Sequence, residues 1–321
     1  MVLLGRLTNC PRSLKDALDG VAYLLLRAAW SALGLLPLAV TRSVLEWLSS
    51  LVGRCDRRHR EVIARNLIIA FPDLSGAERE RVTDRAFRNW GRIAAELIHG
   101  ATVVRNADRR WVDEVEAIAT AQQRQGTGLL VLTAHTGNFE LLGRIWGATS
   151  GRRISVLHRA MGNRYADSFL RRERVAMNVD SLERGVAARV ILAKLHGGGM
   201  LAAPLDQNQP PGRPGVFVEM FGRPAATATV LARLSVATGA PVLPVFALWT
   251  DAGPGAVVGR PIHPPAHPVP VGQRQEVIRD LTAAYTREVE AAVRRHPDQW
   301  NWAHRRWKTR PDTSGSGRAS A

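Results

Sequence analysis

The stretch GLLVLTAHTGNFE, residues 128–140, decides the expected fold of this chain. Its first half is a short, continuously apolar run, which is typical of a β-strand buried on both faces. Three similar runs follow: ISVLHRA (154–160), MLAAPLD (200–206) and VLPVFALW (242–249). Strands of this kind belong to parallel sheets that are covered by helices on both sides.

Segments with helical periodicity lie before and between these runs. They predict helices within residues 61–74, 77–100, 138–148, 163–177, 186–196, 227–238 and 273–296. The alternation of strands and helices indicates an α/β fold with a mostly parallel central sheet flanked by helices.

The N-terminal segment VAYLLLRAAWSALGLLPLAV (21–40) is apolar for nearly the length that crosses a bilayer core. Arg27 interrupts the run, and Pro37 would kink a helix. We expect a membrane-inserted or interfacial anchoring helix, with Arg27 and Trp30 at the level of the headgroups. A buried core helix and a cleaved signal peptide are the alternatives.

The organisation that we expect is therefore a membrane-anchoring segment (1–56), a main domain (57–310) and a disordered tail (311–321). The length of 321 residues is ample for a sizeable core, and two cysteines do not make a disulfide framework. The formal net charge is +16, and only three of the basic residues are lysines. Guanidinium groups bind phosphates and carboxylates in bidentate fashion, so acidic substrates, anionic membranes and nucleic acids are all compatible partners.

Candidate catalytic residues follow the first apolar run, because open α/β sheets bind ligands beyond the carboxyl ends of their strands. His135 lies in the loop, and Glu140 lies in the first turn of the next helix, where the two side chains can approach each other. A carboxylate that holds one ring nitrogen stabilises the imidazolium that forms when the other nitrogen takes a proton. The pair suits deprotonation of a substrate hydroxyl; a surface histidine beside a helix-capping glutamate is the alternative.

Two further candidates follow later strands. Asp206 ends the run MLAAPLD and can hold a basic partner or orient a substrate hydroxyl, or it can simply begin a turn. In FVEMFGRPAATAT (217–229), Gly222 precedes an expected helix, and nearby amides with Thr227 are candidates for binding an anion or a carbonyl oxygen. An ordinary strand–turn–helix connection is the alternative there.

The C-terminal cluster interleaves basic and aromatic residues. Arg305, Arg306 and Lys308 lie among tryptophans, a pattern that suits nucleic-acid stacking, a membrane interface with acidic headgroups, or a solvated helix end. The sequence has no Walker A motif, no G-x-G-x-x-G after a strand and no Cys-x-x-Cys. We therefore expect neither a metal nor another cofactor.

Taken in order, these motifs resemble those of the bacterial lipid A late acyltransferases, the lauroyl and myristoyl transferases of the lipopolysaccharide pathway. The wider lysophospholipid acyltransferase superfamily has related motifs. The similarity covers most of residues 20–311. It rests on RNLIIAFPDLS (65–75), HTGNFE (135–140), APLDQ (203–207), GVFVEMFGRPAATAT (215–229), TGAPVLPVF (238–246) and HPDQWNWAHRRWKTRP (296–311).

The resemblance implies roles for individual residues. It makes His135 the general base and Glu140 its orienting acid, and it matches Asp206 to the family's strand-end aspartate. Arg174 lies about where the family has a functional arginine. Arg174 or backbone amides near Gly222 would then stabilise the developing oxyanion.

The resemblance also implies an activity for the 57–310 domain. It implies transfer of a fatty acyl chain from acyl carrier protein, or from acyl-CoA, to a hydroxyl of a phosphorylated glycolipid, a lipid A precursor. The site would face the cytoplasm at the bacterial inner membrane, with membrane lipids and no nucleic acid as partners. A phosphatidylinositol mannoside or other glycolipid or lysophospholipid acyltransferase is the alternative enzyme. A basic protein that binds membranes or nucleic acid is the alternative without catalysis.

Overall fold

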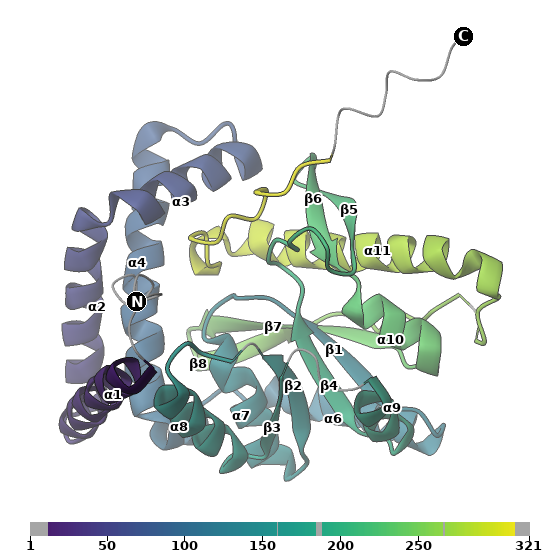
Figure 1. Cartoon of the computed structure of the whole chain (residues 1–321), viewed down its shortest axis with the longest axis horizontal. Helices are drawn as coiled ribbons and strands as arrows, with labels where there is room; N and C mark the ends of the chain where they lie inside the picture. The colour runs from purple at the N-terminus through teal and green to yellow at the C-terminus, as the bar shows by residue number, and fades with distance from the viewer. Residues whose placement is uncertain (1–11, 159, 184–187, 266, 312–321) are drawn as a thin grey trace.

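The computed structural model describes residues 12–311, except Arg159, residues 184–187 and Ala266. Its centre is a six-stranded sheet in the order β3-β2-β4-β1-β7-β8 (Figure 1). All of its strands are parallel except β8, which pairs antiparallel with β7 at one edge. Their bounds are β1 Leu129–Thr133, β2 Ile154–His158, β3 Val179–Glu183, β4 Met200–Pro204, β7 Val242–Thr250 and β8 Gly253–Val258.

The four apolar runs are confirmed as β1, β2, β4 and β7, and so is the expected α/β fold with a mostly parallel sheet. Sequence analysis missed β3 and β8, which lie at the two edges of the sheet and are not continuously apolar. It also missed a separate hairpin of β5 (Gly215–Met220) and β6 (Arg223–Ala228). The expected helix over residues 227–238 begins only at Val230, after this hairpin.

Helices cover both faces of the sheet (Figure 1). They are α1 Arg12–Gly34, α2 Leu38–Cys55, α3 Arg57–Ala70, α4 Gly76–Ile98, α5 Gly100–Arg105, α6 Arg110–Arg124, α7 Phe139–Ser150, α8 Arg164–Val175, α9 Ala188–His196, α10 Val230–Thr238 and α11 Arg274–Arg295, with short 3-10 turns at Val271–Gln273 and Pro297–Gln299. Alternate residues of β1 point to opposite faces, as a pleated strand requires. Leu130 and Leu132 pack with α9, α10 and α11, whereas Leu129 and Val131 pack with α5, α6 and α7.

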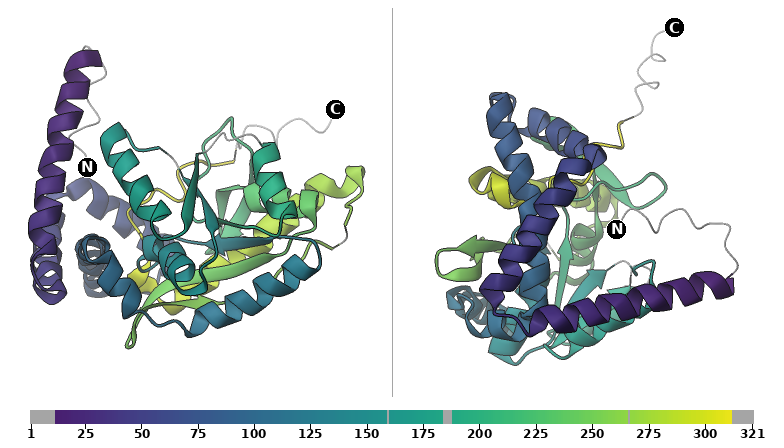
Figure 2. Two further views of the ribbon diagram at one scale, coloured as in Figure 1. Left: turned by 90° about the horizontal axis from the view of Figure 1, so that it is seen from below. Right: turned by 90° about the vertical axis from the view of Figure 1, so that its left-hand side faces the viewer.

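The N-terminal helices lie outside the sheet domain, where α2 packs along α4 (Figure 2). The apolar segment 21–40 is not one helix, because α1 ends at Gly34 and α2 begins at Leu38, directly after Pro37. Among the helices described, none combines the length and the apolarity that crossing a bilayer requires. Anchoring by residues 1–56 stays a prediction, and the expected tail lies outside the described residues beyond Pro311.

Close contact between α2 and α4 depends on glycines. A Cβ on Gly91 of α4 would lie 2.2 Å from the carbonyl oxygen of Leu45 on α2. A Cβ on Gly53 of α2 would lie 2.5 Å from the ring of Phe87 on α4. Both distances are far inside van der Waals contact, so the two helices approach this closely only because glycine occupies these positions.

We predict that Gly91→Ala destabilises the protein by about 1–3 kcal/mol, because the added methyl group forces the two helices apart. The matched control is Gly76→Ala in the first turn of the same helix, where an added Cβ has no atom within 4 Å. Chemical denaturation of both variants measures the difference. Equal free energies of unfolding would contradict the packing argument.

Candidate active site

The HTGNFE loop joins β1 to α7 and carries His135 at the carboxyl edge of the sheet. Gly137 has a φ of 48°, and a Cβ there would lie 2.8 Å from a carbonyl oxygen of β7. Glycine therefore lets the loop lie directly against the sheet. The side-chain amide of Asn138 donates to Glu96 of α4 (3.0 Å), and the same carboxylate accepts from Trp249 Nε1 (3.0 Å). These buried contacts fix the loop that presents His135.

A buried aspartate holds the ring of His135. Asp206 lies two residues beyond β4, and its Oδ1 is 2.8 Å from Nδ1 of His135. Its Oδ2 accepts from the backbone N–H of His135 (2.9 Å) and from Nε1 of Trp300 (2.8 Å). Burial opposes ionisation of Asp206, but the facing charge of His135 and the hydrogen bonds from His135 and Trp300 hold its pKa well below the usual range.

The ionised carboxylate determines the tautomer of His135. Because Asp206 can only accept, Nδ1 of the ring donates the hydrogen bond, and Nε2 of the neutral ring keeps its lone pair. The side-chain amide nitrogen of Gln207 lies 3.2 Å from Nε2 and donates to it. The nitrogen that faces away from Asp206 is therefore the one that can accept a proton from a substrate.

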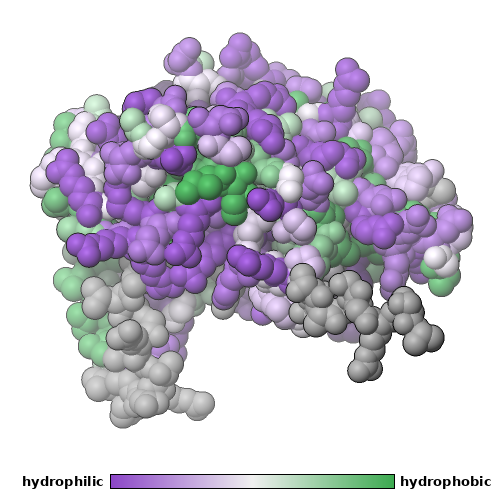
Figure 3. Space-filling view, turned by 90° about the horizontal axis from the view of Figure 1, so that it is seen from above, coloured by the Kyte–Doolittle hydropathy of each residue, from purple (hydrophilic) through white to green (hydrophobic). Residues whose placement is uncertain are grey.

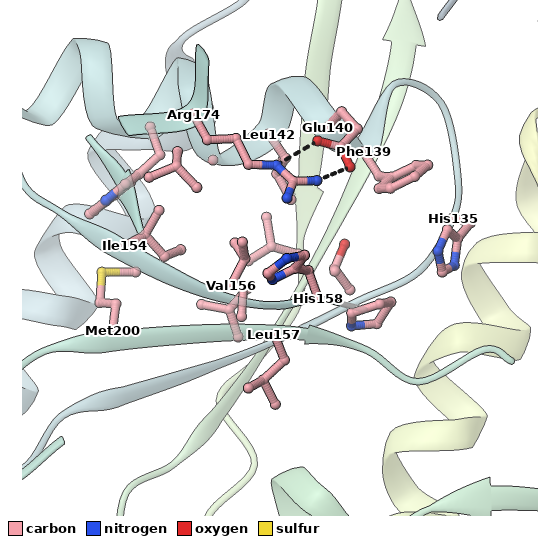
Figure 4. Close-up of a pocket in the computed structure, with 18 of the residues that line it drawn as sticks. His135, Phe139, Glu140, Leu142, Ile154, Val156, Leu157, His158, Arg174 and Met200 are labelled. Carbon is pink, nitrogen blue, oxygen red and sulfur yellow. Dashed lines mark hydrogen bonds and ion pairs between the residues drawn. The ribbon is translucent and has the colours of Figure 1, made fainter. Parts of the chain in front are cut away.

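Glu140 and Arg174 form a second pair beside His135. Arg174 Nη2 lies 2.6 Å from Glu140 Oε1, and Nε lies 3.1 Å from Oε2, which makes a bidentate ion pair (Figure 4). Arg174 is 7% exposed and also donates to Ser181 (3.3 Å). The structure corrects the predicted orienting acid, since it places Asp206 and not Glu140 at Nδ1 of His135. Asp206 comes from β4, the neighbour of β1, whereas Glu140 faces α8.

A large apolar cavity of about 560 Å³ extends from His135 between the sheet and helices α6, α7 and α8. Figure 4 shows His135 at one end, and Ile154 and Met200 at the other. Ile154 and Met200 are the first residues of β2 and β4, whereas His158 and Pro204 are the last. The cavity therefore runs along strands of five residues, about 13 Å at ~3.3 Å per residue.

A second cavity of about 220 Å³ lies on the other side of His135, against α4 and the segment 299–301. His135 and Phe139 line both cavities, and their rings are in edge contact with centroids 4.5 Å apart. A group in either cavity can thus reach the same imidazole.

The basic C-terminal cluster divides into a buried and an exposed part. Arg306, predicted to lie in a surface patch, is fully buried, and it donates to the carbonyl oxygens of Ala226 (2.7 Å) and Gln207 (3.3 Å). Burial lowers the pKa of Arg306 to about 10, although the negative charge of Asp206 partly offsets this effect. Arg306 is therefore a buried packing residue, which corrects its predicted place in the basic surface patch.

Arg305 and Lys308 are exposed and line a groove of about 280 Å³ between the C-terminal segment and α3. Arg65 and Arg310 lie in the same groove. Four cationic side chains over an apolar floor favour a ligand that carries phosphate or carboxylate groups.

The predicted anion site at Gly222 and Thr227 is corrected. Gly222 forms the exposed turn of the β5–β6 hairpin with a φ of 68°, and it does not line either cavity at His135. Thr227 is fully buried, and its hydroxyl accepts from Arg306 (2.5 Å) and donates to Ala225 (3.0 Å). The hydroxyl is therefore part of the hairpin's internal packing.

Arg27 and Trp30 face the protein. The guanidinium carbon of Arg27 lies 4.4 Å from the ring centroid of Phe169 on α8, and Trp30 makes an edge contact with the same ring at 5.2 Å. These contacts tie α1 to α8. Both side chains stay half-buried, and their position at the lipid headgroups stays a prediction.

Sequence reasoning missed Gln207, Trp300 and Glu96 as site residues. Trp300 is one of the tryptophans of the aromatic–basic cluster, yet it is 1% exposed and donates to Asp206. The signal that was available for Gln207 was its position directly after Asp206. Nothing in the local sequence indicated that Glu96 supports the loop.

The fold is an α/β domain in which His135, held by Asp206, lies at the end of a long apolar cavity. The family model of the bacterial lipid A biosynthesis acyltransferases matches residues 14–309. The chain therefore belongs to this family and is an acyltransferase, as the motifs indicated.

Curated relatives align over most of their lengths. The chain is 30% identical over 296 residues to the lipid A biosynthesis palmitoleoyltransferase of Escherichia coli K12, an alignment that covers 88% of this chain and 91% of that protein. It is 28% identical over 271 residues to the lipid A biosynthesis lauroyltransferase of the same strain, with 83% and 84% covered. It is 27% identical over 291 residues to the lipid A biosynthesis acyltransferase of Haemophilus influenzae, with 89% of each covered.

The site contains a pH-sensitive contact. Nε2 of His304 accepts from the backbone N–H of Asn208 (2.8 Å), and burial, with the charges of His135 and Arg306, lowers the pKa of His304 to about 4. The unfolded chain, with a histidine pKa of 6.5, binds more protons between these values, so stability rises with pH there. The contribution of neutral His304 to the free energy of unfolding is complete above pH 6.5 and is lost as the pH falls towards 4.

We predict that His304→Gln flattens this pH dependence, because its amide oxygen can accept the same hydrogen bond without titrating. The wild type should lose up to about 3 kcal/mol more than the variant between pH 6.5 and pH 4. Urea unfolding of both proteins at several pH values measures it. Parallel curves would show that His304 does not titrate in this range.

Proposed function

We propose that the protein is a membrane-bound O-acyltransferase that moves a fatty acyl chain from a thioester donor to a hydroxyl of a lipid A precursor. The observation that carries the proposal is the position of His135, oriented by Asp206, where a long apolar cavity meets a second cavity. The apolar cavity suits the acyl chain, and the second cavity suits the approach of the acceptor. Acyl carrier protein or acyl-CoA is the proposed donor.

In the proposed reaction, Nε2 of His135 takes the proton of the acceptor hydroxyl as its oxygen attacks the thioester carbonyl carbon. Asp206 stabilises the imidazolium that forms. When the C–S bond breaks, the leaving thiolate takes the proton from His135, so the enzyme returns to its starting state. The side-chain amide of Gln207 donates to Nε2 of His135 in the free protein. When the acceptor hydroxyl takes that position beside Nε2, the amide is placed to donate to an oxygen of the substrate instead.

Two features support a phosphorylated acceptor. The relatives are named for lipid A biosynthesis. The groove at Arg305 and Lys308 offers cations to phosphate groups, and the net charge of +16 favours an anionic surface and an acidic donor protein.

Exposed apolar side chains of α1 and α2 support binding to a membrane, which we propose is the bacterial inner membrane, with the site on its cytoplasmic side. They include Leu24, Leu25, Trp47, Leu51 and Val52, and Leu35 is exposed in the connection between the two helices. Figure 3 shows apolar residues along the left-hand edge, where Figure 1 places these helices, beside a mostly hydrophilic face. Exposed apolar side chains gathered on neighbouring helices are typical of proteins that insert helices into the lipid interface.

We predict that His135→Ala and Asp206→Asn each lower turnover at least ~10²-fold, because the first removes the base and the second removes its ionised partner. Glu140→Gln serves as the comparison: if Glu140 oriented the ring, its loss would have the larger effect. Acyl transfer to a purified lipid A precursor measures the rates. Unchanged turnover of His135→Ala would remove this residue from the mechanism.

The same variant tests the acceptor in cells. Mass spectrometry of membrane glycolipids, with and without the gene, should show loss of one acyl chain from lipid A in the deletion and in the His135→Ala strain. Loss from another glycolipid would reassign the acceptor. No change in any lipid would contradict the proposed reaction.

We predict that Ile154→Phe shifts donor preference towards shorter acyl chains, because Ile154 lines the far end of the apolar cavity. An acyl chain that is one methylene too long for the shortened cavity should lose about 10-fold or more in kcat/KM. Ile154→Val, which removes a methylene from the side chain and so enlarges the cavity, is the control and should keep its activity with the longer acyl chain. A parallel loss for all chain lengths would contradict the placement of the acyl chain.

We predict that replacing Leu25 and Trp47 together by Ser lowers partitioning onto anionic vesicles at least ~10-fold, because each buried apolar side chain contributes about 1.5–3 kcal/mol. The two side chains are 67% and 63% exposed. Val271→Ser, at a 78% exposed position before α11, is the control. Vesicle flotation measures binding, and equal binding of all three proteins would contradict the proposed surface.

A further inference from the structure

We propose that His158, Asp167 and Glu183 form a binding site for a divalent transition-metal ion at the wall of the apolar cavity. His158 ends β2, Glu183 ends β3, and Asp167 lies in α8. One ligand atom from each of the three lies within 4.8 Å of the others. This arrangement rests on the geometry alone and does not depend on the proposed reaction.

His158 is the residue that points to a ligand. Its side chain is 9% exposed, and neither ring nitrogen hydrogen-bonds to any residue in the described part of the chain. Figure 4 shows the imidazole among the side chains that line the cavity. A buried polar group without a partner is destabilising, so the ring is placed for a group that binds there.

The carboxylates supply the opposite charge. Asp167 Oδ1 lies 3.9 Å from Nε2 of His158 and accepts from the backbone N–H of Met161 (2.9 Å), which orients it as outer contacts orient metal ligands. Glu183 lies opposite His158 in the β2–β3 register and pairs with the exposed Arg171 (3.2 Å). A divalent ion competes with that surface pair, which is worth little on its own.

The donor set selects the metal. One imidazole nitrogen with carboxylate oxygens suits Zn²⁺, Mn²⁺ or Fe²⁺ better than Mg²⁺ or Ca²⁺, which prefer oxygen ligands alone. Three protein ligands leave coordination positions open. Because the ligands come from β2, β3 and α8, the ion would tie together the wall of the cavity that also carries Arg174.

The test is a titration of the full chain, purified without a polyhistidine tag and stripped of metal, with Zn²⁺ and with Mn²⁺ in a calorimeter. We expect one equivalent of Zn²⁺ to bind more tightly than Mn²⁺, as the order of metal affinities requires. His158→Gln and Asp167→Asn should each weaken Zn²⁺ binding at least ~100-fold. His263→Gln, at an exposed histidine in a loop, is the matched control and should bind like the wild type.

Thermal unfolding gives a second readout, because a ligand that binds only the folded state raises Tm. Saturating Zn²⁺ should raise Tm for the wild type and the His263 variant, and not for the His158 variant. If the folded wild type binds no stoichiometric metal at about 1 mM, the Kd is weaker than about 1 mM and the proposal is overturned. Undiminished binding by the His158 and Asp167 variants would overturn it as well. Both variants are checked for folding by circular dichroism.

Discussion

The buried carboxylate of Asp206 joins three parts of the chain that are far apart in sequence. It accepts from the loop after β1 through His135 and from the C-terminal segment through Trp300, while its own backbone continues β4. The C-terminal segment adds backbone contacts to the same loop, since Asn301 donates to the carbonyl of His135 (2.9 Å). Removing one partner of a buried charge typically costs about 3–5 kcal/mol, so this contact stabilises the fold and fixes the ring of His135 together.

Arg306 holds the loop after β4, in which Asp206 lies. Its guanidinium is fully buried and donates to Gln207, directly after Asp206, and to the β5–β6 hairpin at Ala226 and Thr227. The opposing charge of Asp206 helps to keep Arg306 ionised despite burial. The hairpin therefore holds the C-terminal segment in place, and this explains why Thr227 is part of the scaffold and not of the substrate site.

The sequence predicted what depends on local periodicity and failed where distant contacts decide. Continuous apolar runs located β1, β2, β4 and β7, and the rule for strand ends located His135 and Asp206. The sequence could not decide whether Glu140 or Asp206 faces the imidazole of His135, because that depends on which strand lies beside β1 in the sheet. Arg305 and Arg306 are adjacent in sequence, yet only the packed structure shows that one is exposed and the other buried.

The pair of Glu140 and Arg174 has a physical reason beside an apolar cavity. Arg174 is 7% exposed, and an unpaired cation at this depth would be costly and would attract water into the apolar cavity. The bidentate contact with Glu140 neutralises it while keeping α7 and α8 together across the cavity. His135 and Glu140, five positions apart in one loop and helix start, thus belong to two different pairs, one with Asp206 and one with Arg174 in the cavity wall.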